Sequence, residues 1–435
     1  MPKQRYEPTE KKSFLNERPG NVTTFHKRNT YLVALLCCLT VCALYLCFAL
    51  LINRNLISSS QNYFTYLLDS FLHGRVDVKP PSTFDLSFYQ SKWYLYWGPA
   101  PVLFILPFYL VSHLQASDTL YTLVGGAGNV ILFYFLMQEF QKYFNISLSL
   151  IAEAFLLFSF GLASPNFVLS LNGNIWFTSQ IFATMYLLLF YLCYFLFLNS
   201  EKYFLFLLAT VFFYLAVLSR YSLIFNGILY IYLLVHYRLS GRKAPLKIFW
   251  SFGILTLAFA GLLGTYNALR FGNVLEVGQR YQQGAPRFDA ILKSNRILSL
   301  SYVWHNVYYY FLNIVHFRPT SRPVVIDAEG NSVFSVYPAL LLLPVLFYTR
   351  KYVNRKRLLF LGVGSVIVVI STIFLMLYFA TGWVQLGNRY FFDVMPILFL
   401  MLIFILEYVP RSIQLALLLF GMFVNFYGSL AIFGK

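Results

Sequence analysis

The feature that most constrains this chain is its series of long apolar segments. They cover residues 31–52, 99–114, 119–141, 147–163, 175–198, 203–219, 221–237, 248–268, 336–349, 358–380, 393–409 and 412–433. A helix of about 20 apolar residues crosses the hydrocarbon core of a bilayer. Hydrophobic residues make up 59% of the 435 residues and charged residues only 11%. We therefore predict an all-α polytopic membrane protein with about 11–12 transmembrane helices, which leaves little length for a soluble catalytic or DNA-binding domain.

The charge distribution predicts an orientation for these helices. Lysine and arginine number 33 against 16 acidic residues, and seven of the basic residues precede position 29. Cytoplasmic segments carry such an excess, so we predict a disordered basic cytoplasmic tail over 1–28 and one membrane domain over 29–435. We predict that the basic loops near 238–247 and 350–357 lie on the same side, and that loops 54–97 (the first outer loop), 270–335 (the second outer loop) and 381–392 lie outside. The expected location is the inner (plasma) membrane, and membrane lipids rather than nucleic acid are the expected partners.

The number of segments conflicts with this orientation at one place. Six apolar segments separate the first outer loop from the basic loop at 238, although an odd number of crossings is required. One of them must be re-entrant, interfacial or merged with its neighbour. The candidates are the proline-rich segment 99–114 and the pair of segments over 203–237.

The first outer loop contains a predicted amphipathic helix. In residues 59–73, apolar residues recur at Phe64, Leu67, Leu68 and beyond with helical spacing, and Gly74 follows as a stop signal. The opposite face carries Asp69 and His73, which are neighbours four residues apart. These two side chains either belong to a site or form a solvated polar face.

Three stretches in a fixed order resemble one family. After the helix come Asp85, the pattern Lys92-x-Tyr94-x-Tyr96 and a Gly-Pro-x-Pro run at 98–101; later come NALRFGNVLEVGQRYQ at 267–282 and LGNRYFFDVMP at 386–396. This order resembles the multi-spanning GT-C glycosyltransferases, which take sugars from polyprenyl-phosphate carriers, and is most similar to bacterial GT-C-like proteins of unassigned substrate. One departure stands out, because many family members open the outer helix with an Asp-Glu pair where this chain has Ser60-Gln61.

The resemblance implies a glycosyltransferase that works on the outer face. Its donor would be a polyprenyl-phosphate sugar and its acceptor an envelope glycan, lipid or protein. Such transfer needs a base for the acceptor hydroxyl. We prefer Asp85, which precedes an aromatic stretch, and keep Asp69 as the alternative; a helix N-cap is the structural reading of Asp85. His73, Lys92, Tyr94 and Tyr96 are the expected lining of the substrate groove.

Arginine residues are the candidates for binding the donor phosphate, because the guanidinium binds oxygen atoms in pairs. Arg220 interrupts two apolar segments, and it either binds phosphate or extends to the membrane surface. Arg389 with Tyr390, and Arg280, lie in outer loops, where they meet either phosphate or lipid headgroups. We expect no organic cofactor and assign no metal ligands, and metal dependence stays open.

Two other functions remain open from the sequence. The chain can be a transporter or flippase of lipid-linked sugars, or a non-enzymatic scaffold in envelope glycan assembly. A transporter needs ionisable groups within several spans, and few acids occur there, most of them at segment ends. This distribution favours the enzyme.

Overall fold

The computed structural model describes residues 24–53, 56–239, 241, 243–294, 296–318, 324–349 and 354–434. Residues 1–23 of the predicted tail lie outside the described residues, as do Arg242, Arg350 and Lys351 of the basic loops. The first helix, α1, already begins at Thr24.

Helices dominate the described residues, and seven of them are long and apolar enough to cross a membrane. They are α1 (Thr24–Asn53), α4 (Asp118–Phe144), α7 (Ile175–Ser200), η2 with α9 (Tyr221–Ile228 and Leu229–Leu239), α10 (Leu246–Phe271), α15 (Arg355–Leu377) and α17 (Arg411–Phe433). Four shorter apolar helices join them: α3 with η1 (Val102–Ser112 and His113–Gln115), α5 (Leu150–Leu162), α8 (Tyr203–Ser219) and η7 with α14 (Pro338–Leu342 and Val345–Thr349). The predicted all-α, multi-pass membrane architecture is confirmed.

Short elements connect these helices. The helical ones are α2 (Tyr63–Leu72), α6 (Pro165–Ser170), η3 (Gln279–Tyr281), η4 (Pro286–Phe288), α11 (Asp289–Lys293), η5 (Leu300–Tyr302), α12 (Val303–Val307), η6 (Tyr308–Leu312), α13 (Val333–Val336), η9 (Arg389–Val394), α16 (Met395–Leu402) and η10 (Leu406–Tyr408). The strands are β1 (Leu86–Tyr89), β2 (Lys92–Tyr94), β3 (Gln282–Gln283), β4 (His316–Phe317) and β5 (Val324–Val325). The predicted apolar segment 393–409 is therefore not one continuous helix, because it contains the end of η9, then α16 and η10.

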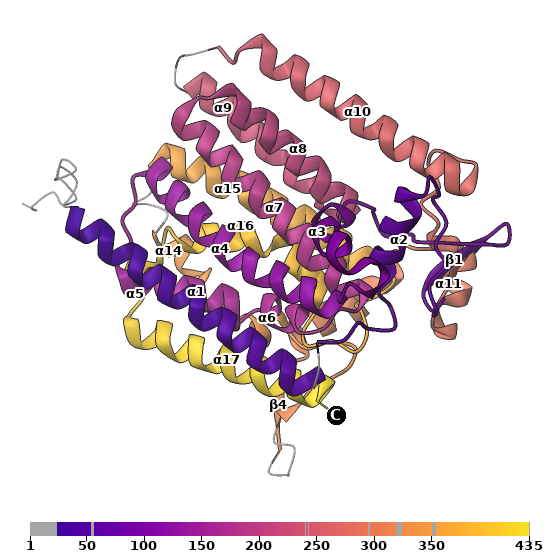
Figure 1. Ribbon diagram of the computed structural model, residues 1–435. Coiled ribbons are helices and arrows are strands. Elements are labelled where there is room, and N and C mark those ends of the chain that lie inside the picture. Colours follow the sequence, from indigo (N-terminus) through magenta and orange to yellow (C-terminus); the bar gives the residue numbers. More distant parts are fainter. Residues whose placement is uncertain are drawn as a thin grey trace, which may run out of the picture.

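The helices form a bundle (Figure 1), and the residues at its two ends differ in chemistry. At one end, called here the basic end, Lys356 and Arg357 of α15 donate to the carbonyls of Tyr143 and Phe144, the last residues of α4. Cations at a helix C-terminus satisfy its free carbonyls and its dipole. The opposite end, called here the cavity end, carries α2, β1 and α11 (Figure 1).

The core of the bundle is aromatic. Phe133 of α4 stacks on Phe160 of α5, with ring centroids 4.5 Å apart, and meets Phe399 of α16 edge to face. In contrast, α10 packs mainly along α8 and has few buried side chains, and in Figure 1 it lies along the outside of the bundle. The core therefore holds α4, α5, α7 and α16 together, while α10 leaves most of its surface to the lipid.

The α3 helix explains the extra apolar segment. Its 11 residues reach about 16 Å, roughly half of a hydrocarbon core. Before α3, the amide of Ala100 donates to the carbonyl of Leu218 at the cavity end of α8; after it, the Ala116 carbonyl accepts from Ser58 and Asn62 of the first outer loop. Both ends thus lie at the cavity end. Without α3, five crossings separate the first outer loop from residue 238, the odd number that the charge distribution requires.

A small antiparallel sheet connects the two outer loops. Its strand order is β2-β1-β3, with Ser87 paired to Tyr94 in β2 and to Gln282 in β3. The two-residue turn between β1 and β2 has positive φ angles at Gln90 (47°) and Ser91 (61°), the geometry that suits a tight hairpin. The predicted amphipathic helix is present as α2, and Leu67 and Leu68 pack into a cluster with Ile105 of α3.

We expect cysteines at Ser91 and Leu114 to be labelled from the same side of the membrane. Both positions are exposed at the cavity end, whereas exposed Lys202 lies between α7 and α8 at the basic end. In a variant without native cysteines, a membrane-impermeant maleimide applied to intact cells should label Ser91→Cys and Leu114→Cys but not Lys202→Cys. Labelling of Ser91→Cys without Leu114→Cys would mean that α3 crosses the membrane.

Candidate active site

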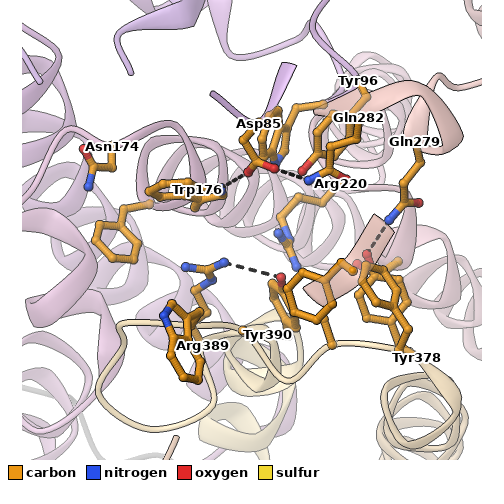
Figure 2. Close-up of a pocket in the computed structure, with 18 of the residues that line it drawn as sticks. Asp85, Tyr96, Asn174, Trp176, Arg220, Gln279, Gln282, Tyr378, Arg389 and Tyr390 are labelled. Carbon is orange, nitrogen blue, oxygen red and sulfur yellow. Dashed lines mark hydrogen bonds between the residues drawn. The ribbon is translucent and has the colours of Figure 1, made fainter. Parts of the chain in front are cut away.

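A cavity of about 540 Å³ opens at the cavity end of the bundle. Its walls come from the loops 54–97 and 270–335, from the start of α7, from the break between α8 and η2, and from the segment that joins α15 to η9. The side chains on these walls with a hydroxyl, amide, carboxylate or guanidinium group are Gln61, Asp85, Tyr96, Asn174, Ser219, Arg220, Tyr221, Ser222, Gln279, Gln282, Arg287, Tyr378, Arg389 and Tyr390. Figure 2 shows several of them around a common space.

Asp85 is held rigidly on one wall. Its backbone has a φ of +69°, which aspartate tolerates better than most residues, and its amide donates to the Gln283 carbonyl. One carboxylate oxygen accepts from Nε1 of Trp176 at 2.5 Å and the other from Nε2 of Gln282 (Figure 2). The sheet therefore fixes the backbone of Asp85, and two neutral donors fix its side chain. The alternative role of Asp85 as a helix N-cap does not hold, because Leu86 begins a strand.

Burial raises the pKa of Asp85 to about 6. The hydrogen bonds from Trp176 and Gln282 and the positive charge of Arg389 lower it again, but they offset only part of the desolvation. A carboxyl group with such a pKa is ionised at neutral pH and still binds a proton readily. These are the properties of a general base.

Arg220 is paired with an acid. Its Nε and Nη2 atoms donate to both carboxylate oxygens of Asp393 at 2.9–3.2 Å, and Ser222 donates to the same carboxylate at 2.7 Å. The paired contact uses one side of the guanidinium, and its Nη1 atom makes no hydrogen bond with the described residues. Most of the charge of Arg220 is thus compensated within the protein.

Arg389 is a buried cation on the cavity wall that has no such partner among the described residues. Its side chain is only 5% exposed, yet within the described part of the chain no carboxylate forms an ion pair with it and its Nε has no hydrogen-bond acceptor. Its guanidinium lies near the rings of Phe177 and Tyr390, and Nη2 donates to the Tyr390 hydroxyl at 3.3 Å (Figure 2). A buried charge is costly unless it is paired, so this arrangement suits an anionic ligand.

Five predicted site residues line the cavity, and five do not. Asp85, Tyr96, Arg220, Arg389 and Tyr390 line it. Among the others, Asp69 accepts from Tyr109 of α3 at 2.7 Å and lies 3.6 Å from both His73 and Arg75, in a cluster of its own. Tyr94 packs on Phe271, Lys92 is exposed in β2, and Arg280 pairs with Glu276 at 2.6 Å.

The sequence reasoning missed several functional candidates. Trp176 and Gln282 bind Asp85, and Asp393 binds Arg220. Gln61, which stands where many of the glycosyltransferases that the sequence resembles have an acidic pair, lines the cavity. Two signals were available, because Gln282 closes the stretch at 267–282 and Asp393 lies in the stretch at 386–396. Among the described residues, no group of three or more His, Cys, Asp or Glu side chains is placed to hold a metal ion.

Comparison with solved structures identifies the fold. No protein-family model matches the sequence, and no curated protein matches it. The structure is similar to apo ArnT from Cupriavidus metallidurans (TM-score 0.50, 14% identity, 89% of this chain and 61% of that chain). It is also similar to the apo Archaeoglobus fulgidus oligosaccharyltransferase (TM-score 0.50, 13% identity, 92% of this chain and 56% of that chain). The chain has a GT-C fold. It spans less than two thirds of the length of either membrane glycosyltransferase, and the identities are low, so this likeness concerns the GT-C fold alone.

Proposed function

We propose that this GT-C protein is a glycosyltransferase that moves a sugar from a polyprenyl-phosphate carrier to a hydroxyl group of an envelope glycan, lipid or protein. One observation carries the proposal: a buried carboxylate with a pKa of about 6, Asp85, and a buried arginine without an acidic partner, Arg389, line the same cavity. The reaction needs a base and a cation at one place, and the proposed site is on the outer face of the inner (plasma) membrane.

The two side chains have complementary roles in this reaction. The acceptor oxygen forms a bond to the anomeric carbon while the bond from that carbon to the phosphate oxygen breaks. Asp85 accepts the proton of the acceptor hydroxyl, and the bonding electron pair leaves with the lipid phosphate, whose charge Arg389 stabilises. The free edge of Arg220 and the Tyr390 hydroxyl can support the same oxygen atoms. Both arginines would already be oriented before the donor binds, because Arg389 is buried and Arg220 is held by Asp393.

The cavity also has an apolar side that suits an isoprenoid chain. Phe374 and Leu375, in the last turn of α15, line it together with Phe379. Since α15 is one of the seven long apolar helices, this wall continues into the membrane region of the bundle. A lipid tail can therefore lie along α15 while its phosphate meets the arginines.

The distribution of buried charge fits an enzyme better than a transporter. The buried charged residues among those described are Asp77, Asp85, Asp118, Glu153, Arg270, Arg389 and Asp393. Six lie at the cavity end, and Glu153 lies in the first turn of α5 at the basic end. A relay of ionisable groups through the middle of several spans would support transport. The buried charges instead gather mainly at one end of the bundle, where two of them, Asp85 and Arg389, line the cavity.

Purified protein in detergent should release polyprenyl phosphate from at least one member of a panel of labelled polyprenyl-phosphate sugars, with transfer of the label to an added acceptor. Reconstituted liposomes provide the second measurement. If the protein moved the intact lipid-linked sugars between leaflets and never cleaved them, it would be a flippase and the proposal would be wrong.

Activity should fall below about pH 6. Because the acidic form of Asp85 cannot accept a proton, kcat/KM should decrease tenfold per pH unit below its pKa of about 6. Gln282→Leu removes a hydrogen bond that favours the ionised form of Asp85 and should therefore raise its pKa. The acidic limb of the pH–rate profile should then move to higher pH. The matched control is Gln283→Leu, whose exposed side chain is not on the cavity wall. If Gln282→Leu did not shift the acidic limb of the pH–rate profile, Asp85 would not be the titrating group.

A further inference from the structure

A second arginine without an acidic partner lies at the mouth of the cavity. Arg287, in η4 of the second outer loop, lines the cavity, and it has no ion pair or side-chain hydrogen bond with any described residue. Its guanidinium lies 3.7 Å from the ring centroid of Trp383 and 4.3 Å from that of Phe288. Stacking on an aromatic face leaves the N–H groups at the edge of the guanidinium free to bind an anion.

The segment that carries Trp383 has an unusual backbone. Gly382 has a φ of +117° and Val384 a φ of +49°, and a β-branched residue is a rare outlier in this region. A Cβ atom at Gly382 would collide with the side chain of Gln385, which is buried and donates to the carbonyls of Glu329 and Thr381. Surrounding contacts thus enforce a strained turn. Such strain is typical of ligand sites. The turn places Trp383 at the mouth of the cavity, where its side chain is 49% exposed.

Binding of the donor phosphate does not require both Arg389 and Arg287. A phosphodiester carries one negative charge, and the reaction requires it beside Asp85 and the buried Arg389. Arg220 is compensated by Asp393, which leaves Arg287 as the additional cation on the cavity wall. Arg287 is exposed whereas Arg389 is buried, so the two occupy different depths of the cavity. An anion at the mouth is therefore separate from the donor phosphate.

We propose that Arg287 and Trp383 form a second, anion-binding subsite, which takes an acidic group, a carboxylate or a phosphate, of the acceptor. This inference rests on the proposed glycosyl transfer, and it specifies the chemical class of the acceptor. The guanidinium binds the acidic group through its free edge, and the free face of the indole packs on the adjoining sugar ring. The acceptor hydroxyl then extends inward toward Asp85.

Binding of two matched lipids to protein in a neutral detergent tests the subsite without chemistry. Glucuronosyl diacylglycerol carries a carboxylate, and glucosyl diacylglycerol is its neutral counterpart. The wild type should bind the acidic lipid more tightly, by about tenfold or more, and Arg287→Ala should abolish this preference. Arg287→Lys should retain only part of the preference, and Trp383→Ala should weaken the binding of both lipids. The control is Arg296→Ala, an exposed residue of the same loop that does not line the cavity.

Each other outcome has a defined meaning. Equal affinity of the wild type for the two lipids, or a preference that survives Arg287→Ala, would overturn the subsite. The subsite would also be overturned if Arg287→Ala lowered the affinity for polyprenyl pyrophosphate more than the affinity for polyprenyl phosphate. Arg287 would then bind the donor. If the preference depends on Arg287 but no donor is ever cleaved, the subsite stands and the proposed glycosyl transfer fails. If transfer occurs with equal efficiency to acidic and neutral acceptors in wild type and Arg287→Ala, the transfer stands and the subsite fails.

Discussion

Asp85→Asn is expected to lower kcat by about 10²- to 10⁴-fold, the range for loss of a general base. Asparagine keeps the size of the side chain and one acceptor oxygen for Trp176 or Gln282, but it cannot take the proton of the acceptor hydroxyl. The protein should therefore fold and bind the donor as the wild type does. Steady-state transfer from a labelled lipid-phosphate sugar, with the melting temperature in detergent measured in parallel, checks both statements.

Two other aspartates of the first outer loop are matched controls. Asp77 lies 3.5 Å from Arg75, and Asp69 belongs to the cluster with Tyr109, His73 and Arg75 away from the cavity. Asp69→Asn and Asp77→Asn should change kcat by less than about tenfold. If Asp69→Asn were the inactive variant and Asp85→Asn remained active, the base would belong to α2 and the cavity would have a different role.

Arg389→Ala is expected to lower kcat/KM for the donor by about 10²- to 10³-fold, as for removal of a preorganised electrostatic contact. The side chain forms no ion pair with the described residues, so its removal breaks no salt bridge and only takes away a positive charge that lowers the pKa of Asp85. Stability should change little for this reason. Arg389→Lys keeps the charge but loses the paired geometry, and it should recover only part of the activity. A donor titration at fixed acceptor measures the effect.

Arg220 provides the contrast for this prediction. Arg220→Lys removes the paired hydrogen bonds to Asp393, so the melting temperature should fall together with activity. Arg389→Lys should affect donor use while the melting temperature stays near that of the wild type. If Arg389→Ala had wild-type donor efficiency and Arg220→Lys lost donor use without loss of stability, the phosphate site would lie at Arg220.

The sequence predicts local features of this fold well, because they depend on neighbouring residues. The apolar segments, the amphipathic helix α2 and the stop at Gly74 follow from spacing within one stretch of chain. The preference for Asp85 as the base rests on the same kind of local evidence, an aspartate before an aromatic run, and its catalytic role stays a prediction. The excess apolar segment was detectable by counting, but only the contacts at Ala100 and Ala116 show that α3 begins and ends on one side.

The partners of the site residues could not be predicted, since they are distant in sequence. Gln282 reaches Asp85 from 197 residues away, and Asp393 reaches Arg220 from 173 residues away. For this reason Arg220 resembled the main phosphate ligand in the sequence, whereas the structure places a carboxylate against it. For Arg389 the sequence leaves phosphate and a lipid headgroup as alternatives, because nothing in its local sequence indicates that it is buried without an acid.

The most direct test of this account is the time course of polyprenyl-phosphate release from a labelled polyprenyl-phosphate sugar, measured side by side for the wild type, Asp85→Asn and Arg389→Ala. The account predicts rapid release by the wild type, and release reduced by about 100-fold or more in both variants. It also predicts that only Arg389→Ala loses donor affinity. Release at the wild-type rate by Asp85→Asn, with the donor and acceptor both saturating, would contradict it.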